Sequence, residues 1–424
     1  MKTIQSISDV DVDSDLMTPY DPQVGILGIP INDLSLDDTI EAIDGLIDEG
    51  GFHQIATANL DFLTKAIKDE ELREILCRCD LVVADGMPLV WASRMMGFPL
   101  SQRVTGADLL PRIAELSQRR QRRIFLLGGT EERSREGVKT LEAMYPGCLI
   151  VGRYSPPVGT LDELDHTYIL DRIEQAAPDI LLVAFGNPKQ EKWLSMHRNR
   201  LNVPVCIGIG ASLDFLSGDL SRAPMWMQRA GMEWFFRFVV EPRRLAARYL
   251  SNLTCVLRHL SVQVATVVMQ DRNVDGARVS FQRRENALIA KVTGYFSGPL
   301  VEEFTAHLQR GLEPDDCLVL DLSLTTALGA DALGLLARLG SQMAERRQDV
   351  WLTGMQSGIR RVLKRSLQMG RPFRVAPQVN DVLRRVNCLI PNVKPRKILR
   401  EVFSYELSLT PQQGKFAAKT AVSR

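Results

Sequence analysis

A short apolar run that ends abruptly in a polar turn constrains the fold of this chain most strongly. The run extends from Ile180 to Phe185 and stops at Gly186-Asn187-Pro188, beyond which residues 189–192 are all polar. Apolar runs of this length bounded by Gly and Pro are typical of buried strands in a parallel sheet. Open α/β sheets bind ligands just beyond the carboxyl ends of such strands. The segment therefore predicts both a parallel sheet and a ligand site at its edge.

Other short apolar runs alternate with segments of helical periodicity along the first half of the chain. Such alternation predicts an α/β fold in which helices cover both faces of a Rossmann-like parallel sheet. We expect this core to occupy residues 24–218, after a flexible tail at 1–23. Strands are expected at 25–29, 53–58, 81–84, 123–127, 149–152, 180–185 and 205–209, and helices at 35–49, 60–68, 106–119, 131–144 and 160–176.

The character of the sequence changes after residue 218. Residues 219–270 show no strand pattern and are rich in Arg, Trp and Phe. A polar break at 270–276 introduces a second, smaller α/β domain, which we place at 275–390, before a C-terminal tail at 391–424. The expected strands of this domain are 286–293, 317–322 and 350–353, and its expected helices are 299–309 and 332–346.

Composition limits the classes of partner and location. The formal net charge of the 424 residues is +1, so the overall charge gives no argument for a nucleic-acid partner. No apolar run reaches the roughly 18 residues that a membrane-spanning helix needs, and the polar N-terminal segment does not resemble a signal peptide. The seven cysteines are scattered, which favours free thiols in a reducing compartment. We therefore expect a cytoplasmic protein.

Polar residues follow two of the expected strands where ligand sites form. Thr57 and Asn59 offer a hydroxyl and an amide to a sugar or a phosphate, although Asn59 is also suited to cap the next helix. Asp85 follows four apolar residues and precedes a turn that contains glycine. A carboxylate there can act as a general base, or it can bond its own backbone as a turn aspartate.

Two further segments carry residues suited to phosphate. Arg103 precedes a helix that opens with Gly106, so it can bind a phosphate together with free N–H groups; the alternative is a surface arginine. Gly128 and Gly129 separate a strand from a helix and allow a diphosphate to approach, although a lone glycine pair is weak evidence. The spacing Asp9-Val-Asp11 matches the metal-binding pair of many sugar transferases. It lies in the polar tail, and we interpret it as a solvated charge run.

Taken in order, these segments resemble one protein family. The stretches TANLDF, ADGMPLVW, RVTGADL, FLLGG, AFGNPKQEKW, GIGASLDFLSG and RAPMWMQRAGMEWFFRFVVEPRRL are similar to the WecG/TagA/CpsF glycosyltransferases, glycosyltransferase family 26, over about residues 24–260. The resemblance implies transfer of a sugar from a UDP-sugar to a polyprenyl-diphosphate-linked saccharide in cell-surface polysaccharide synthesis. It implies inversion at the anomeric carbon without a metal or other cofactor. Relatives transfer N-acetylmannosamine, its uronic acid or glucose.

The resemblance also implies roles for individual residues. Asp85 matches the catalytic base, and Thr57 and Asn59 match pocket residues beside it. Lys189 and Lys192 stay open between phosphate contacts and plain surface charges. The residues that match the donor site are Arg103, Gly128, Gly129, Gly186, Asn187, Gln190 and Glu191.

The segment 219–260 has an unusual charge for a nearly neutral protein. It carries seven arginines and three acidic residues, a local net charge of +4 (seven minus three), interleaved with Trp and Phe. Basic and aromatic residues together favour binding to a membrane surface; a helix pair with a solvated basic face is the alternative. In the family this appendage closes the active site and docks on the bilayer, which implies a peripheral protein on the inner face of the cell membrane. Candidates for contact with diphosphate or membrane are Arg237, Arg243, Arg244 and Arg248.

The second domain resembles the sulfate transporter and anti-sigma factor antagonist domain, or STAS domain. The likeness rests on Asp321-Leu322-Ser323 at a strand end and on Ala330–Leu336 at a helix start. Regulatory members carry a phosphorylatable serine where this chain has residues 329–332. Asp331 is either a mimic of that negative charge or a favourable first-turn residue of the helix, and we favour the latter. The domain is expected to dock a protein partner. The alternative for the whole chain is a non-catalytic regulator that binds a nucleotide-sugar and signals through this domain.

Overall fold

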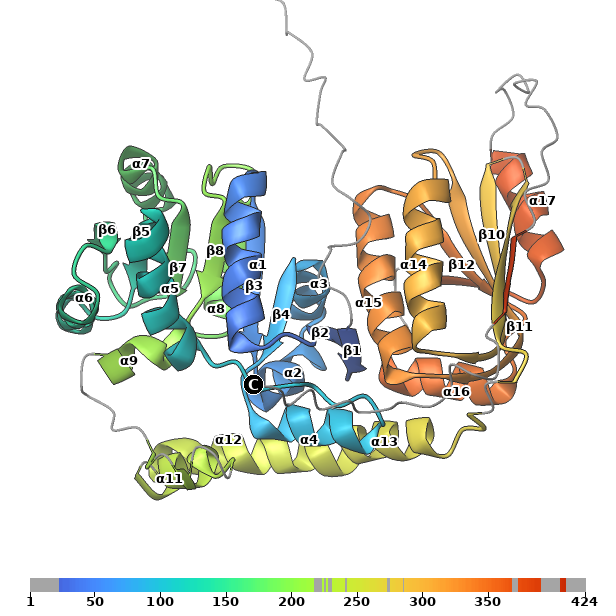
Figure 1. Ribbon diagram of the computed structural model, residues 1–424, viewed down its shortest axis with the longest axis horizontal. Helices are drawn as coiled ribbons and strands as arrows, with labels where there is room; N and C mark the ends of the chain where they lie inside the picture. Colours follow the sequence, from blue (N-terminus) through green and yellow to red (C-terminus); the bar gives the residue numbers. More distant parts are fainter. Residues whose placement is uncertain are drawn as a thin grey trace, which may run out of the picture.

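The computed structural model describes residues 23–216, 223–224, 226–227, 231–240, 242–272, 275–284, 286–367, 373–389 and 405–408. Residues 1–22 of the expected N-terminal tail, and most of the expected C-terminal tail at 391–424, lie outside these ranges. Figure 1 shows two α/β units side by side, with a run of helices beneath both.

The first unit is built on a six-stranded sheet. Its strands are β3 (His53–Ala58), β4 (Leu81–Ala84), β5 (Arg123–Gly128), β6 (Leu149–Tyr154), β7 (Ile180–Ala184) and β8 (Val205–Gly208). They lie in the order β4-β3-β8-β7-β5-β6, and every neighbouring pair is parallel. The predicted parallel sheet is therefore confirmed, and its interior strands are buried almost throughout because both faces are covered.

Helices cover both faces of this sheet. They are α1 (Leu36–Glu49), α2 (Leu60–Ala66), α3 (Glu70–Arg78), α4 (Met87–Met95), α5 (Gly106–Arg120), α6 (Glu131–Met144), α7 (His166–Ala176), α8 (Lys189–His197) and α9 (Leu213–Leu216), with a 3-10 turn η1 (Gly210–Ser212). Helices α1 and α5 pack on one face, and α7 and α8 pack on the other. The polar residues 189–192 form the first turn of α8, and Trp193 behind them is fully buried.

The apolar run at 25–29 does not join the parallel sheet, which corrects the expectation for it. It forms a hairpin of β1 (Gln23–Ile26) and β2 (Ile29–Asn32), which pair antiparallel. The turn residues Leu27 and Gly28 have φ of 52° and 83°, and tight two-residue hairpins require such positive values. The hairpin is buried throughout because it is enclosed between the two units.

The second unit contains a mixed six-stranded sheet. Its strands are β9 (Arg278–Arg284), β10 (Ala287–Phe296), β11 (Cys317–Leu328), β12 (Val350–Thr353), β13 (Phe373–Ala376) and β14 (Tyr405–Ser408). Its helices are α14 (Pro299–Gly311), α15 (Ala330–Glu345), α16 (Ser357–Ser366) and α17 (Val379–Leu389). The order is β13-β12-β11-β10-β9-β14, parallel from β10 to β13 and antiparallel at β9. The sequence predicted β10 to β12, α14 and α15, but it missed β9, β13, α16 and α17, which are rich in arginine.

Helix α15 forms the contact between the two units. Residues 330–340 are all buried, because the helix packs on its own sheet and also against β1, β2 and α3. Gly25 and Gly334 bring the two backbones so close that a Cβ on Gly25 would lie 2.5 Å from the nitrogen of Gly334. Helix α15, whose start carries the resemblance to a STAS domain, is therefore covered within the chain.

A buried arginine completes this contact. The Arg338 side chain is 1% exposed. Its Nε donates to the Gln23 side chain at 3.0 Å, and its Nη1 donates to the Asp80 carbonyl at 3.0 Å. At the end of α15, Glu345 pairs with Arg198 at 2.6 Å. The two units share one continuous apolar core as well as these polar contacts.

The expected appendage at 219–270 is helical where it is described. It comprises α11 (Glu233–Val240), α12 (Pro242–Cys255), a π-helical turn η2 (Val256–Leu260) and α13 (Ser261–Val268), which run beneath both units (Figure 1). The Gln263 amide donates to the Gly25 carbonyl and accepts from the Leu27 N–H, both at 2.8 Å. Among the described residues, no helix is long and apolar enough to span a membrane.

Candidate active site

The predicted site residues of the first unit gather at the carboxyl edge of the parallel sheet. Strand β3 ends before Asn59, β4 ends before Asp85, β5 ends at Gly128 and β7 ends shortly before Gly186. The chain passes from β5 to β6 and from β7 to β8 in opposite directions along the sheet. Diverging connections of this kind open a crevice between neighbouring strands, where α/β sheets bind ligands.

Backbone hydrogen bonds fix Asp85 at this edge, directly after the terminal strand β4. The Asp85 N–H donates to the Ala58 carbonyl at 2.7 Å, and the Val104 N–H donates to the Ala84 carbonyl at 2.9 Å. Asp85 therefore lies between the end of β3 and the segment that carries Arg103, and it is half-buried. A carboxylate in this position is accessible to a substrate that enters from the carboxyl edge.

Thr57 and Asn59 flank Asp85 but are both engaged with the protein. The Thr57 hydroxyl donates to the Gly208 carbonyl at 3.2 Å and so joins β3 to the end of β8. The Asn59 side chain accepts from the N–H groups of Asp61 and Phe62 at 3.0 and 3.2 Å, which makes it the N-cap of α2. The alternative that Asn59 caps a helix is therefore confirmed, because its side-chain oxygen makes the cap hydrogen bonds.

Arg103 reaches toward the appendage. Its Nη1 donates to Oε2 of Glu233 on α11 at 2.7 Å, and its Nη2 lies 3.9 Å from Asp108. The Arg103 and Glu233 side chains are 16% and 7% exposed, so solvent screens their interaction weakly. This ion pair ties α11 to the loop in front of α5.

A glycine of the appendage makes a second contact with the loop that carries Asp85. Gly231 has a φ of 71°, and a Cβ there would lie 2.6 Å from Cγ of Met87, two residues beyond Asp85. Together with the Arg103–Glu233 pair, this contact places the appendage over the Asp85 loop. In the sequence, Glu233 is only one of the three acidic residues of the segment 219–260. The available signal for its role was an acidic residue placed directly after Gly231-Met232 in a segment of net positive charge.

Gly128 and Gly129 are required by close packing. Their φ values are 102° and 71°, which L side chains adopt at a cost. A Cβ on Gly128 would lie 2.9 Å from the carbonyl carbon of Ala184. Helix α6 then begins with Glu131 and Glu132. These carboxylates would oppose an anion at the N-terminus of α6, so a diphosphate fits better beside the glycines than on the helix axis.

A buried cluster joins the loops after β7 and β8. Gln190 is 1% exposed, and its Oε1 accepts from the N–H groups of Gly186 at 3.1 Å and Gly210 at 3.0 Å. Its Nε2 donates to Glu191 at 2.7 Å. Glu191 is also 1% exposed and accepts from the Asn187 amide at 3.1 Å. Burial raises the pKa of Glu191 to about 7.

This cluster contains side chains whose hydrogen bonds are made within the protein and one acceptor whose hydrogen bond is not. Both ends of the Gln190 side chain are occupied by protein groups, so the amide holds the loop from behind. The Oδ1 of Asn187 has no hydrogen-bond partner among the described residues. Because buried acceptors are nearly always paired, this oxygen suits a hydroxyl or N–H of a ligand, or a water.

The two lysines of the polar turn have structural partners. Lys192 pairs with Asp69 at 2.8 Å and with Glu71 at 2.6 Å, both at the start of α3. Lys189 donates to the Gly159 carbonyl at 2.6 Å and lies over the Phe185 ring. The surface-charge alternative therefore describes Lys192 better than a phosphate contact does.

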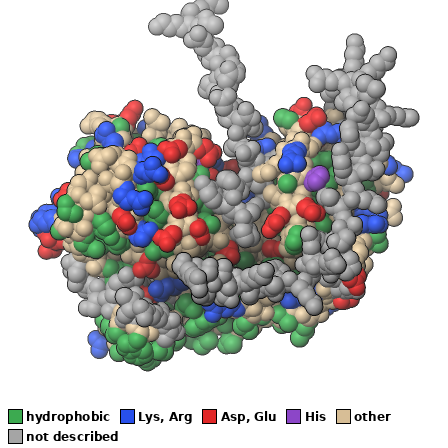
Figure 2. Space-filling model, viewed as in Figure 1, with side chains coloured by type: hydrophobic (Ala, Val, Ile, Leu, Met, Phe, Trp, Pro, Cys, Tyr) green, Lys and Arg blue, Asp and Glu red, His purple; other side chains and the backbone are tan. Residues whose placement is uncertain are grey.

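The appendage presents an apolar face to solvent. Arg243 is exposed, whereas the side chains of Arg237, Arg244 and Arg248 lie outside the described part of the chain. Figure 2 shows hydrophobic side chains gathered along the lower margin of the molecule, where α11 to α13 lie. The exposed apolar residues of the appendage are Trp226, Trp234, Phe235, Val239, Val240, Leu250, Leu253, Leu257, Val268 and Met269.

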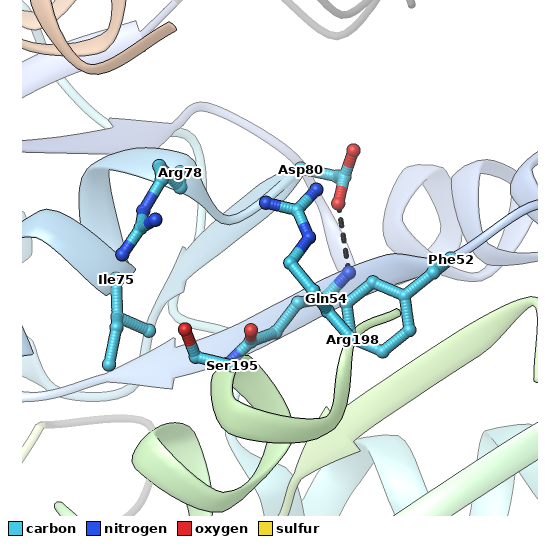
Figure 3. Close-up of a pocket in the computed structure, with 7 residues that line it drawn as sticks. All are labelled: Phe52, Gln54, Ile75, Arg78, Asp80, Ser195 and Arg198. Carbon is cyan, nitrogen blue, oxygen red and sulfur yellow. Dashed lines mark hydrogen bonds between the residues drawn. The ribbon is translucent and has the colours of Figure 1, made fainter. Parts of the chain in front are cut away.

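A small cavity lies at the opposite edge of the sheet from Asp85. It has a volume of about 10 Å³ and is lined by Phe52, Gln54, Ile75, Arg78, Asp80, Ser195 and Arg198 (Figure 3). The Gln54 N–H donates to Asp80 at 2.8 Å, the bond drawn in Figure 3. A space of this size holds about one water molecule, so it is not a substrate site.

Comparison with known proteins agrees with this arrangement. Residues 24–267 match the glycosyl transferase WecG/TagA/CpsF family. The match covers the parallel sheet, the site at its carboxyl edge and the helices of the appendage. The chain therefore belongs to the WecG/TagA/CpsF family, and it is a glycosyltransferase.

Several similar proteins share the name N-acetylglucosaminyldiphosphoundecaprenol N-acetyl-beta-D-mannosaminyltransferase. The one from Bacillus subtilis (strain 168) is 34% identical over 190 residues, which are 45% of this chain and 72% of that protein. The one from Staphylococcus aureus (strain MRSA252) is 28% identical over 225 residues, 53% of this chain and 87% of that protein. The one from Bacillus spizizenii is 30% identical over 208 residues, 48% and 79% of the two chains.

Proposed function

We propose that this enzyme transfers a sugar from a UDP-sugar to a polyprenyl-diphosphate-linked saccharide, with inversion at the anomeric carbon and without a metal. N-acetylmannosamine is the first candidate because the relatives are named mannosaminyltransferases; its uronic acid and glucose are the others. The observation that carries the proposal is the position of Asp85. This half-buried carboxylate lies at the carboxyl edge of a parallel sheet, under an appendage that is rich in arginine and aromatic residues.

In the proposed reaction, Asp85 takes the proton of the attacking acceptor hydroxyl. The hydroxyl oxygen bonds to the anomeric carbon while the bond from that carbon to the diphosphate oxygen breaks, and UDP leaves with the electron pair. Such a displacement needs a base on the acceptor side and positive charge on the leaving diphosphate. Thr57 and Asn59 support the base because they fix the ends of β3 and α2 on either side of it.

We assign donor recognition to the loops after β5 and β7. Gly128, Gly129 and Gly186 have positive φ and no side chain, which permits close approach of the donor to the backbone. Asn187 contributes its unpaired Oδ1. Gln190 and Glu191 act from behind as positioning residues, because their side chains are buried in the cluster that holds the turn. This replaces the direct donor contact that the resemblance implied for Gln190.

The positive charge for the diphosphate is proposed to come from the junction of core and appendage. Arg103 lies there in contact with Glu233, and the appendage adds Arg237, Arg243, Arg244 and Arg248. The exposed apolar face of α11 to α13 lies on the same segment. We infer that this face rests on the inner surface of the cell membrane, where a polyprenyl-linked acceptor is held.

For the second unit, we propose the STAS-like assignment on its order of elements. Two strands, β9 and β10, are followed by three helix–strand pairs and a final helix, α14 to α17. Hydrogen bonds at the start of α15 support a structural role for Asp331. Its carboxylate accepts from the Ser297 hydroxyl at 3.0 Å and from the Gly298 N–H at 2.5 Å. A carboxylate enclosed in this way cannot display a phosphate-like charge to a partner.

The test is transfer of radiolabelled sugar from UDP-N-acetylmannosamine to a short-chain prenyl-diphosphate-linked N-acetylglucosamine, with EDTA present. Asp85→Asn should lose about a hundredfold or more of kcat with little change in the KM for the donor. Asp162→Asn, at an exposed carboxylate in the loop before α7, is the matched control. Wild-type rates in Asp85→Asn would overturn the role of Asp85, and loss of wild-type activity in EDTA would overturn metal independence.

The same assay separates the enzyme from the alternative of a nucleotide-sugar-binding regulator. Binding of several UDP-sugars without transfer of any of them would favour the regulator. Membership of a glycosyltransferase family and the retention of Thr57, Asp85, Arg103 and Gln190 favour the enzyme.

A further inference from the structure

Helix α16 of the second unit carries a one-sided cationic face. Its sequence, SGIRRVLKRS, contains four cations and no acidic residue. Ile359, Val362 and Leu363 are buried against the rest of the protein. The four cations are all exposed: Arg360, Arg361, Lys364 and Arg365. The helix is thus anchored by one apolar side, and its exposed side carries the four cations and no acidic residue.

The charges of this face are not neutralised by any residue that the structure describes. Some exposed arginines of the molecule pair with a carboxylate, as Arg283 does with Asp316 at 2.9 Å. In contrast, none of the four cations of α16 forms an ion pair with any described residue. Four unpaired cations within two turns of helix repel one another. An anionic partner would relieve this repulsion.

The position of α16 indicates which partner that is. Helix α16 packs beside α13, the last helix of the appendage. Figure 1 shows α16 along the lower edge of the second unit, next to the run of α12 and α13. The end of α13 exposes Val268 and Met269, the latter 84% exposed. Helix α4 extends the same neighbourhood with exposed Trp91 and Met95. A basic face therefore adjoins a broad apolar face.

We propose that α16 binds the anionic headgroups of membrane lipids, so that the second unit widens the membrane-contacting surface of the transferase. This inference rests on the proposed membrane contact of the appendage. Apolar residues that enter the headgroup region together with adjoining cations are the combination that recognises an anionic bilayer. A nucleic acid or an acidic protein would use the cations but would leave the neighbouring apolar face uncovered.

The geometry gives the second unit a specific task. Its α15 is fixed to β1 and β2 by Arg338 and by the close approach of Gly25 and Gly334. Because the two units share one core, α16 is held at a constant position relative to α11 to α13. Binding of lipid headgroups by α16 would therefore set the orientation of the active site above the bilayer.

The test uses the full-length protein and sedimentation with vesicles of neutral phosphatidylcholine, with or without anionic phosphatidylglycerol. The variant is R360Q/R361Q/K364Q/R365Q. The control removes the same charge at exposed arginines of β9, α14, the end of α15 and α17, as R284Q/R310Q/R347Q/R384Q. The α16 variant should bind anionic vesicles about tenfold or more weakly at low salt, whereas the control should bind like wild type. Transfer in detergent by the α16 variant should equal wild type.

Equal losses in both quadruple variants would show a general charge effect and overturn the proposal. Unchanged vesicle binding of the α16 variant, with weaker binding to a DNA duplex, would overturn it in favour of a different polyanion. A variant of the apolar face, L250S/L253S/L257S, tests the underlying membrane contact separately. Wild-type binding by that variant would overturn the membrane contact of the appendage and, with it, the proposed widening of that surface by α16. Weaker binding by that variant, with unchanged binding by the α16 variant, would keep the appendage contact and overturn the α16 site. Sugar transfer measured in detergent tests the proposed glycosyltransferase activity independently of the two vesicle-binding contacts.

Discussion

Arg103 and Glu233 join the sheet core to the appendage through a 2.7 Å ion pair that is largely shielded from solvent. Arg103 stands in front of α5, one peptide from the Val104 N–H that bonds the end of β4. Glu233 is the first residue of α11. The pair therefore couples the position of the appendage to the loop that carries Asp85. The close packing of Gly231 on the Met87 side chain holds the appendage over the same loop.

Glu233→Gln should loosen the appendage without unfolding the core. The substitution leaves Arg103 partly buried opposite a neutral amide, and removal of one partner of a shielded pair is costly. We expect amide hydrogen exchange in 233–240 to become faster, and kcat to fall about tenfold or more because the site closes imperfectly. Glu132→Gln, at an exposed carboxylate of α6, is the control. Unchanged exchange together with unchanged kcat would show that the pair has no role in closure.

Glu191 should make folding stability depend on pH. Burial raises its folded-state pKa from the usual 4.5 to about 7, so between these values the folded protein holds a proton that the unfolded chain has lost. The free energy of unfolding therefore falls as pH rises from about 4.5 to 7, by about 3 kcal/mol for this group. Below this window the contribution is fully present, and above it the contribution is lost.

Glu191→Gln removes this titration and isolates it from other groups. Asp331 titrates in a similar range, since burial also raises its pKa to about 6. The free energy of unfolding in urea is measured for wild type and variant at pH 5 and pH 8. The change between the two pH values is then compared between the two proteins, and the contribution of Asp331 cancels because both proteins contain it. We expect the variant to lose about 3 kcal/mol less than wild type between these pH values. An identical pH dependence in both proteins would show that Glu191 is not titrating as a buried acid.

Arg338 should be a major determinant of the contact between the two units. Its Nε and Nη1 donate to Gln23 and Asp80, and its side chain is 1% exposed. Arg338→Ala leaves these acceptors unpaired and opens a cavity, so we expect a loss of about 3–5 kcal/mol in the free energy of unfolding. Arg310→Ala, on exposed α14, should cost less than about 0.5 kcal/mol. A similar cost for both substitutions, measured by urea unfolding, would contradict this assignment.

The sequence predicted the parallel sheet, and the placement of the candidate residues at its carboxyl edge, because both depend on local signals. Apolar runs such as 180–184 end at Gly and Pro, and the carboxyl ends of parallel strands meet at one edge, which brings Asp85, Gly128 and Asn187 together. Contacts between distant segments have no such signal. The hairpin at 23–32 resembled a core strand because its burial comes from α15, more than 290 residues away in sequence. The buried position of Gln190 had no local signal either, because its partners Gly186 and Gly210 lie on different loops.

The approach of Gly25 to Gly334 gives a prediction that depends on shape alone. A Cβ on Gly25 would lie 2.5 Å from the Gly334 nitrogen and 2.7 Å from the Leu333 carbonyl carbon, both backbone atoms that cannot move aside singly. Gly25→Ala should therefore push α15 away from β1. We expect a loss of about 2 kcal/mol or more in the free energy of unfolding, although alanine is ordinarily better than glycine in a strand.

Gly334→Ala tests the same contact from the helix side and should be milder. The nearest atom to its Cβ, the Gly25 nitrogen, would be 3.0 Å away, so a small shift can accommodate the methyl group. Helix propensity also offsets part of the cost, by about 1 kcal/mol. Gly358→Ala in α16 has nothing within 4 Å of its Cβ and should be neutral or stabilising. Because all three substitutions add one methyl group, the order of unfolding free energies isolates the packing of α15 on β1. Equal effects at the three positions would mean that the two units can separate there without cost.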